Sequence, residues 1–508
     1  MPVFAAVDIG SNSCRLKIAR VHRHRLETLH EDRDVTRLGE SVFQTGVLSP
    51  EAMANTVKAL KRFQRAVQGA AVDKLRVVAT SATRDARNTA AFLAWVRSTT
   101  GWKVEVISGL EEGRLIHAGV MWGEPAAHGR VLLIDLGGGS CEVTLSEDRR
   151  IREMVSLPLG AVRLTQDFLL HDPPRKDEVA RMHQWIQREL RKAQRRLQGT
   201  RVRTVIATSG TAAALEEACQ TMQKGKAGNR QWATRVLVRK LADKLTKLDN
   251  DERAAVPGIG PKRSEIVVAG AHVYSQILDR LDLDGFRYSP MGLRDGILAQ
   301  MLAQQDRATT AHQRFESERW DGVLELCKRY GVDPKSSKPV YDHAIQLFHE
   351  LRKVHELPNE YEFWLKCAAT MHEAGKFLNY QGWHRHTQYV IANSELYGFT
   401  PEERTLVSAL ARYLGKSRPS PQDRVMRGVP PEEQTHVMRA IVLLRMAIAL
   451  NQDRASDVLR VRTVIYPKRV ILEITPGRTG AELELWAVRR EANYFREVFR
   501  RELLTTLP

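Results

Sequence analysis

Short apolar runs alternate with stretches of helical apolar spacing along the first 300 residues. In residues 1–125 this pattern predicts strands at 3–7, 14–19, 75–79 and 104–107, and helices at 50–67, 90–97 and from residue 109 onward. Residues 128–300 repeat the theme, with strands predicted at 131–134 and 202–207, a hairpin through 146–148, an arginine-rich helix at 175–197, and a closing strand and helix around 289–296. Alternation of this kind is typical of α/β layers.

The pattern changes near residue 305. Residues 312–450 show only helical apolar spacing, and an exposed Pro- and Arg-rich loop is predicted at 418–431. The end of the chain predicts a small α+β module, with strands at 458–464, 470–474 and 483–487 and a helix at 491–503. The predicted domains are therefore 1–125, 126–304, 305–450 and 451–508, which suits a chain of 508 residues.

Composition places the chain among ordinary water-soluble proteins, with 43% hydrophobic and 27% charged residues. No apolar stretch approaches the roughly 18 residues that a membrane-spanning helix needs. The best candidate, residues 440–450, is short and is interrupted by Arg445. The first residues run directly into a strand without a cationic leader, and the five cysteines show no metal-binding or disulfide spacing. We expect a cytoplasmic protein with no membrane partner.

The net charge of +18 predicts a polyanionic partner, because a basic field concentrates polyanions. The sequence contains no zinc finger and no RNA-recognition signature, and aromatic residues make up only 6% of the chain. Specific nucleic-acid binding is therefore not expected. A polyanion without bases fits at least as well.

Two similar segments carry the main chemical signal. Each follows an apolar run and delivers Asp-x-Gly and then small residues, namely Asp8, Gly10, Ser11, Asn12 and Ser13 in the first and Asp135, Gly137, Gly138, Gly139 and Ser140 in the second. Glycine lets backbone N–H groups approach a phosphate closely, and an aspartate at a strand end offers oxygen to Mg²⁺. One such turn is a weak signal, but two behind two strands predict related βββαβα-type halves that face each other across a phosphate-binding cleft.

Other candidate residues lie at further strand ends. Arg84 follows the strand at 75–79 and suits bidentate phosphate binding. The same position in the sequence would also suit an ordinary arginine that is exposed to solvent and contacts no phosphate. Glu111 and Glu112 open a helix, where acidic residues also complement the helix dipole without any catalytic role. Glu142 leaves the second glycine loop. These carboxylates could orient a water molecule or hold a metal ion for phosphoanhydride hydrolysis.

The helical region contains His372 followed by Glu373, and His384, Arg385 and His386 a few residues later. The sequence shows no partner histidine upstream, and Asn451 stands where a helix-borne aspartate would be expected. A basic groove or packing between domains is therefore favoured over a metal centre.

Together these residues resemble the exopolyphosphatase/guanosine pentaphosphate phosphatase (Ppx/GppA) family of the actin-like ATPase superfamily. The segments that carry the resemblance are 8–13, 107–112, 135–142, 157–164, 289–298, 371–375 and 384–394. The resemblance implies two actin-like (ribonuclease H-like) α/β domains, then an all-helical HD-like domain and a small α+β domain. It also implies a homodimer.

Carried over by motif, Glu112 resembles the general base, and Asp135 and Glu142, with Asp8, resemble carboxylates that hold Mg²⁺ or Mn²⁺. The two glycine loops, Arg84, and Ser209, Gly210 and Thr211 resemble the phosphate-binding positions, while His384, Arg385 and His386 would extend a polyphosphate track. The expected function is release of terminal orthophosphate from inorganic polyphosphate. The alternatives are guanosine pentaphosphate hydrolysis, possibly alongside the first activity, and, more distantly, an actin-like kinase or a non-catalytic polyanion binder.

Overall fold

The computed structural model describes residues 1–22, 25–197, 202, 204–223, 233–305, 310–452, 458–476 and 480–507. The chain forms two compact units, residues 1–313 and 314–508, and each is described by itself. Among the described residues, none of the helices combines the length and apolar character that a membrane crossing requires. All five cysteines are buried and unpaired.

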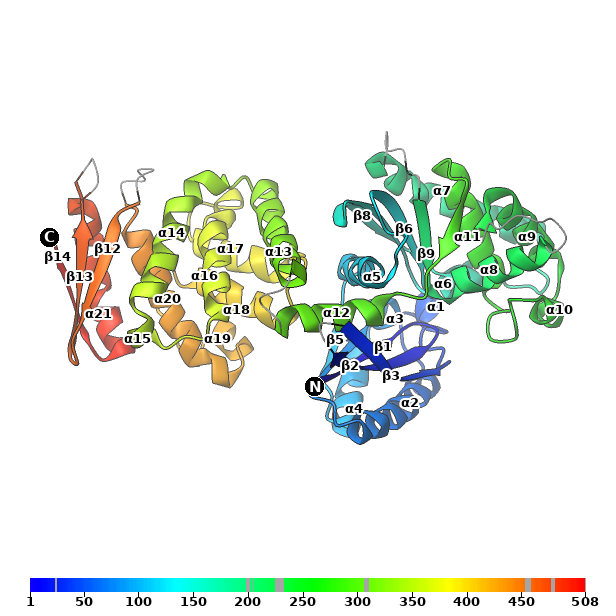
Figure 1. Cartoon of the computed structure of the whole chain (residues 1–508), viewed down its shortest axis with the longest axis horizontal. Coiled ribbons are helices and arrows are strands. Elements are labelled where there is room, and N and C mark those ends of the chain that lie inside the picture. Colours follow the sequence, from blue (N-terminus) through cyan, green and yellow to red (C-terminus); the bar gives the residue numbers. More distant parts are fainter. Residues whose placement is uncertain are drawn as a thin grey trace. The chain divides into compact units, whose positions relative to one another are not determined.

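The first half of the first unit is built on a mixed sheet in the order β3-β2-β1-β4-β5 (Figure 1). Its elements are β1 (Val3–Ile9), β2 (Cys14–His22), β3 (Arg25–Asp34), α1 (Val42–Thr45), α2 (Pro50–Gly69), β4 (Lys74–Ala79), α3 (Ser81–Asp85), α4 (Thr89–Thr100) and β5 (Val104–Val106). Strand β1 runs antiparallel to β2 and parallel to β4. The predicted strands and helices are confirmed. Strand β3 was not predicted, because it is almost entirely polar and lies at the sheet edge.

The second half repeats this strand order. Its elements are β6 (Arg130–Leu136), β7 (Cys141–Glu147), β8 (Arg150–Leu157), α6 (Ala161–Phe168), α7 (Lys176–Leu197), β9 (Thr204–Thr208), α8 (Ser209–Met222), β10 (Ala233–Thr234), α9 (Arg235–Lys247), α10 (Asn250–Ala255), α11 (Val267–Arg280) and β11 (Gly285–Tyr288). The sheet order is β10-β11-β9-β6-β7-β8, so β8-β7-β6-β9-β11 corresponds to β3-β2-β1-β4-β5. This agreement confirms the two related halves.

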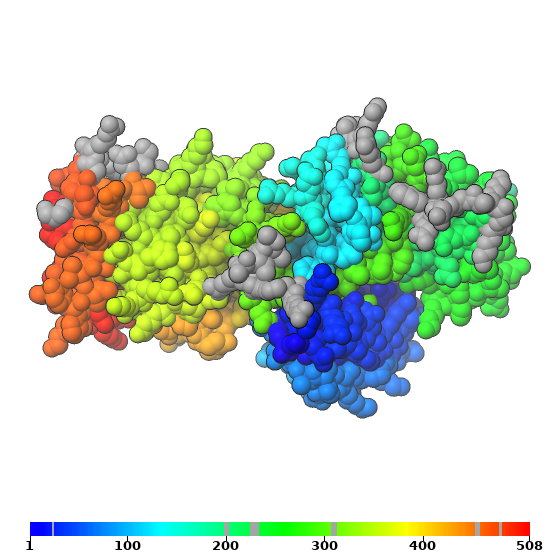
Figure 2. All heavy atoms as spheres, in the orientation of Figure 1, coloured from blue at the N-terminus to red at the C-terminus, as the bar shows by residue number. Residues whose placement is uncertain are grey.

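The two halves exchange a helix. Helix α5 (Gly109–Gly123) follows the first sheet in the chain but packs on β7 and β8, whereas α12 (Leu293–Gln305) packs on β1 and β2. The two helices cross at Gly119 and Gly296, where a Cβ on Gly296 would lie 1.7 Å from the Leu115 carbonyl oxygen. Glycine is therefore required at this crossing. Figure 2 shows the first half (blue) packed directly against the second (cyan to green).

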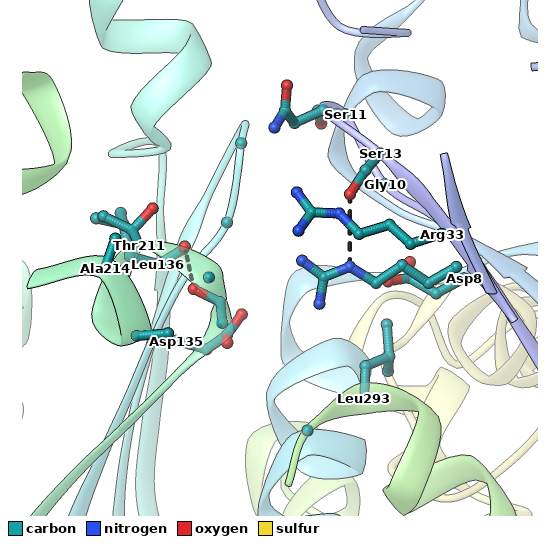
Figure 3. Close-up of a pocket in the computed structure, with 18 of the residues that line it drawn as sticks. Asp8, Gly10, Ser11, Ser13, Arg33, Asp135, Leu136, Thr211, Ala214 and Leu293 are labelled. Carbon is teal, nitrogen blue, oxygen red and sulfur yellow. Dashed lines mark hydrogen bonds between the residues drawn. The ribbon is translucent and has the colours of Figure 1, made fainter. Parts of the chain in front are cut away.

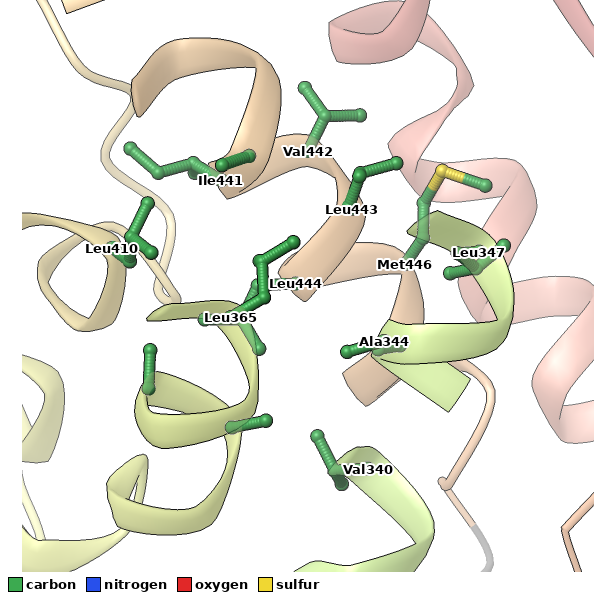
Figure 4. Close-up of a cluster of buried hydrophobic side chains, with 14 of the residues drawn as sticks. Val340, Ala344, Leu347, Leu365, Leu410, Ile441, Val442, Leu443, Leu444 and Met446 are labelled. Carbon is green, nitrogen blue, oxygen red and sulfur yellow. The ribbon is translucent and has the colours of Figure 1, made fainter. Parts of the chain in front are cut away.

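The second unit consists of a helical region and a sheet in the order β12-β13-β14. Its elements are α13 (Thr310–Arg329), α14 (Pro334–Glu350), α15 (Arg352–His355), α16 (Glu360–Met371), η1 (Ala374–Phe377), α17 (Trp383–Asn393), α18 (Pro401–Arg412), α19 (Arg424–Gly428), η2 (Pro431–Glu433), α20 (Gln434–Ala449), β12 (Arg460–Ile465), β13 (Arg469–Thr475), α21 (Glu482–Phe499) and β14 (Glu502–Thr506). Helix α20 lies at the centre of its core, where Ile441, Leu444 and Met446 meet residues of α14, α16 and α18 (Figure 4). A helix that is apolar on nearly every face is typical of such a central position.

Two predictions in the second unit are wrong. Residues 483–487 form the start of α21 instead of a strand, because their buried positions continue with helical spacing through Val488, Phe495 and Phe499 while Leu483 is exposed. The last strand is β14, which lies within and beyond the end of the predicted helix. The loop predicted to be exposed at 418–431 contains the short helix α19 and ends at the first residue of η2, and Met426 is buried there.

Candidate functional site

The loops after β1 and β6 have the same turn and lie against each other. Gly10 N donates to the Ser13 carbonyl at 3.2 Å, and Gly137 N donates to the Ser140 carbonyl at 3.0 Å. A Cβ on Gly138 would lie 3.0 Å from the Ser11 Cβ atom, so the absence of a side chain permits this approach. The predicted phosphate loops of the two halves are therefore neighbours.

A cavity of about 580 Å³ opens between the halves. Among the residues that line it are Asp8, Gly10, Ser11, Asn12, Ser13, Glu112, Asp135, Gly137, Gly138, Gly139, Ser140, Ser209, Gly210 and Thr211. In Figure 3, Asp8, Ser11, Ser13 and Arg33 face Asp135 and Thr211 across this space. The structure thus brings together most of the residues that the sequence singled out.

Asp8, Glu112 and Asp135 line the cavity, whereas Glu142 is not among the lining residues, and burial is the main cause of the altered pKa values of all four carboxyl groups. Burial raises the pKa of Asp8 to about 6 and that of Glu142 to about 7. The pKa values of Asp135 and Glu112 are also raised by burial, and the neighbouring Glu142 raises that of Glu112 further. Carboxyl groups whose pKa values are raised in this way are typical of a site that binds a cation.

Two of these carboxylates retain an unpartnered oxygen. Asp8 Oδ1 and Glu142 Oε2 are buried and have no hydrogen-bond partner among the described residues. The other Glu142 oxygen accepts a hydrogen bond from Ser156 Oγ at 2.7 Å, and Asp135 accepts one from Thr208. Within the described ranges no three His, Cys, Asp or Glu side chains are grouped as a preformed metal site. Magnesium commonly takes one or two carboxylates and completes its shell with water and substrate phosphate, so this donor set fits Mg²⁺.

Glu112 and Glu111 are adjacent in sequence but have different surroundings. Glu112, 7% exposed, lies 3.4 Å from Nη1 of Arg84, which also donates to the Ile107 carbonyl at 2.6 Å. Glu111 instead pairs with buried Arg114, at 2.8 Å from its Nε. Glu111 thus does more than complement the helix dipole. Arg84 is not among the cavity-lining residues, and its phosphate contact stays a prediction.

The cavity also contains four arginines that were not predicted as site residues: Arg15, Arg33, Arg263 and Arg294. Asp8, Arg15 and Arg33 are register partners across β1, β2 and β3, so they form a row over three neighbouring strands. Burial and the neighbouring arginines lower the pKa values of Arg294 and Arg33, and that of Arg263 falls to about 9. Cations that repel one another in this way are typical of a site for a polyanion.

Ser209, Gly210 and Thr211 begin α8 at the far wall of the cavity. Ser209 Oγ donates to the Leu136 carbonyl at 2.6 Å, which ties this turn to the second phosphate loop. A Cβ on Gly210 would lie 1.6 Å from the Arg263 guanidinium, so the arginine can occupy this position only because residue 210 has no side chain. Arg263 Nη1 also lies 3.5 Å from Thr211 Oγ1.

His384, Arg385 and His386 lie in the first turn of α17, in the second unit. The His384 ring packs over Gly415, and burial and the nearby Arg412 lower its pKa. His372 is buried and its Nδ1 donates to the Ala369 carbonyl at 2.6 Å. A polyphosphate track through these residues stays a prediction.

Comparison with known proteins finds matches along most of the chain. A model described as the Ppx/GppA phosphatase family matches residues 17–305, and one described as Ppx/GppA phosphatase, domain III, matches residues 319–483. An exopolyphosphatase from Cytophaga hutchinsonii is 26% identical with a TM-score of 0.55, and the match covers 59% of this chain and 98% of that one. A Ppx/GppA family member from Aquifex aeolicus is 29% identical with a TM-score of 0.51, covering 60% of this chain and 99% of that one.

Proposed function

Because the chain belongs to the Ppx/GppA phosphatase family, we propose that it releases terminal orthophosphate from linear inorganic polyphosphate in a Mg²⁺-assisted reaction. One observation carries the choice of substrate class. Four arginines share the cavity with Asp8, Glu112 and Asp135, and an anion without a cation would be attracted by the arginines but repelled by the carboxylates. A chain of phosphates that brings a divalent cation satisfies both, because the cation meets the carboxylates and the following phosphates meet the arginines.

Glu112 is assigned the role of general base. Its carboxylate accepts a proton from water as the water oxygen attacks the terminal phosphorus, and the bridging P–O bond to the next phosphate breaks. The neighbouring Arg84 favours the ionised form of Glu112, since its charge lowers the pKa of that carboxyl. The N–H groups of the two glycine loops hold the terminal phosphate in line with the water.

Asp8, Asp135 and Glu142 are the residues that would hold Mg²⁺ or Mn²⁺. Their oxygens include the two buried atoms without a hydrogen-bond partner, and hard cations prefer carboxylate ligands. When bound, the cation would neutralise charge on the phosphates and on the departing chain. The predicted homodimer and cytoplasmic location stay predictions.

Hydrolysis of guanosine pentaphosphate is the second candidate. The cavity is also lined by the small residues Ala213, Ala214 and Gly258 and by Glu217. Small side chains leave room for a flat nucleobase, and a carboxylate can accept hydrogen bonds from guanine N–H groups. This wall supports a nucleotide as a second substrate of the same site.

Phosphate release from long-chain polyphosphate and from guanosine pentaphosphate, measured in parallel with and without Mg²⁺, tests the proposal. We expect Mg²⁺-dependent release from polyphosphate at the higher kcat/KM. Release from the nucleotide alone would replace the first candidate by the second. Release from neither substrate by folded protein would contradict both.

A further inference from the structure

A short exposed segment of the second unit joins η1 to α17. Gly375 N donates to Thr387 Oγ1 at 2.9 Å, and the same hydroxyl donates to the His372 carbonyl at 2.9 Å. A Cβ on Gly375 would lie 2.1 Å from the Trp383 carbonyl oxygen, so the two elements pack backbone to backbone. The side chains between them therefore project from a firmly held base.

Phe377, Tyr380 and Trp383 of this segment, together with Tyr330 directly after α13, form an aromatic surface, which we define by these four residues. Phe377 is 63% exposed and Tyr380 is 73% exposed. The rings of Tyr330 and Phe377 meet edge to face with centroids 5.6 Å apart. Tyr330 and Trp383 are half-buried beside these two exposed rings, and exposed aromatic rings that lie together mark binding sites.

Basic residues lie beside these rings. Lys376 Nζ lies 5.3 Å from the Tyr380 centroid and 5.5 Å from the Trp383 centroid. Exposed Arg385 follows in the first turn of α17, and exposed Lys328 and Arg329 immediately precede Tyr330. Lys376 is half-buried and pairs with Glu373. The surface therefore combines flat apolar faces with a positive rim.

We propose that the aromatic surface binds single-stranded nucleic acid without sequence specificity. Bases stack on exposed aromatic rings, and the surrounding lysines and arginines contact the phosphates that link them. Inorganic polyphosphate would use the cations but has no group to stack on the rings. A protein partner is less well matched, because the cores of protein interfaces are depleted of lysine. All four residues of the aromatic surface belong to the second unit, and the carboxylates and arginines of the cavity belong to the first.

Binding of a fluorescent single-stranded oligouridylate of about 15 nucleotides to the full chain tests this proposal. Each stacked base contributes roughly 5- to 150-fold to affinity, so Phe377→Ala with Tyr380→Ala should weaken binding at least about 10-fold. Tyr380→Trp should retain binding. Trp486→Ala is the matched control, because Trp486 is 56% exposed beside Arg490 but stands outside the aromatic surface.

A second pair of measurements separates this site from the cleft. Glu112→Gln should bind the oligonucleotide as the wild type does, and the ring variants should still release phosphate from polyphosphate at an unchanged rate. Lys376→Met should lower the salt dependence of oligonucleotide binding. Equal affinity of the double ring variant and the wild type would overturn the proposal. So would ring variants that lose only self-association, since the surface would then bind a second copy of the chain.

Discussion

The two halves of the first unit share one turn but carry opposite charges at one equivalent position. Asp8 pairs in register with Arg15, and Asp135 pairs in register with Glu142. The residues between them are Ile-Gly-Ser-Asn-Ser-Cys in the first half and Leu-Gly-Gly-Gly-Ser-Cys in the second. The scaffold thus fixes where this side chain lies beside its aspartate, and the residue type decides what it can hold. An arginine there suits phosphate, and a carboxylate suits a cation.

The two side chains at this equivalent position, Glu142 and Arg15, also have different neighbours. Glu142 is 2% exposed and lies near Glu112 of the exchanged helix α5, while Arg15 donates to Ser13 Oγ at 3.4 Å beside the row of arginines. At this equivalent position the second half therefore carries negative charge and the first half carries positive charge. A reaction that needs both a cation and a held anion can use the boundary between them.

The largest loss of activity is expected from substitution of Glu112. Glu112→Gln keeps the size of the side chain but cannot accept a proton from water. Hydrolysis of polyphosphate should fall about 10²–10⁴-fold, the usual range for a general base, while binding stays near wild type. Steady-state rates and equilibrium binding of polyphosphate measure the two effects.

Glu111→Gln is the control for this change. It should leave turnover near wild type but lower the free energy of unfolding by roughly 1–3 kcal/mol, because the Arg114 ion pair is buried. If Glu111→Gln abolished turnover and Glu112→Gln did not, the base would be the neighbouring residue. If neither changed turnover, Glu142 would become the candidate.

The equivalent positions themselves give the next largest effects. Glu142→Gln should weaken Mg²⁺ activation about 10- to 100-fold with a smaller change in KM for polyphosphate. Arg15→Gln should instead raise KM by roughly 10- to 100-fold at saturating Mg²⁺, because it removes a charged phosphate contact. Titrations of both variants with Mg²⁺ and with substrate distinguish these outcomes. Identical effects of the two substitutions would show that the halves do not divide the chemistry.

A pH titration sharpens the comparison further. Burial raises the pKa of Asp8 to about 6 and of Glu142 to about 7, so these groups contribute stability below their unfolded values near 4. That contribution is lost as pH rises through 6 to 7, when both groups must ionise in the folded protein. Mg²⁺ binds the ionised forms, so its stabilising effect should grow over the same interval. Thermal unfolding at pH 5 and pH 8, with and without Mg²⁺, measures it, and an equal Mg²⁺ effect at both values would contradict the assignment.

The smallest effect concerns salt. Affinity for long polyphosphate should fall more steeply with monovalent salt than affinity for guanosine pentaphosphate, since more phosphate contacts release more counterions. Arg33→Gln should reduce the polyphosphate slope by about one. Parallel slopes for both substrates would mean that the arginines contact only the phosphates nearest the carboxylates.

The sequence predicted the aspartates and glycine loops because their chemistry is local, within a few residues of a strand end. It did not predict the arginines as a group, because they gather from β2, β3, the loop before α11 and the start of α12. Arg15 is an instructive miss. The strand that holds it was predicted, but that it shares a row with Asp8 and Arg33 follows only from the register of three strands. Strand β3 itself gave no apolar signal.

The wrong strand at 483–487 has a related cause. Leu483, Leu485 and Ala487 alternate with polar residues or tryptophan as an amphipathic strand would, and the competing helical spacing appears only over a longer window. The structure follows that longer pattern, since Leu485, Val488 and Phe495 are buried while Leu483 and Trp486 are exposed.

The exchange of α5 and α12 has a thermodynamic consequence. Ile116 and Val120 of α5 complete the apolar cluster under β6, and Ile297 and Leu298 of α12 complete the one under β1. Each half therefore contributes a helix to the hydrophobic core of the other half. If one half unfolds, apolar surface becomes exposed in both halves. We therefore expect the two halves to unfold together in one transition. Calorimetry of residues 1–313 should show a single cooperative transition, and two separable transitions would contradict this shared core.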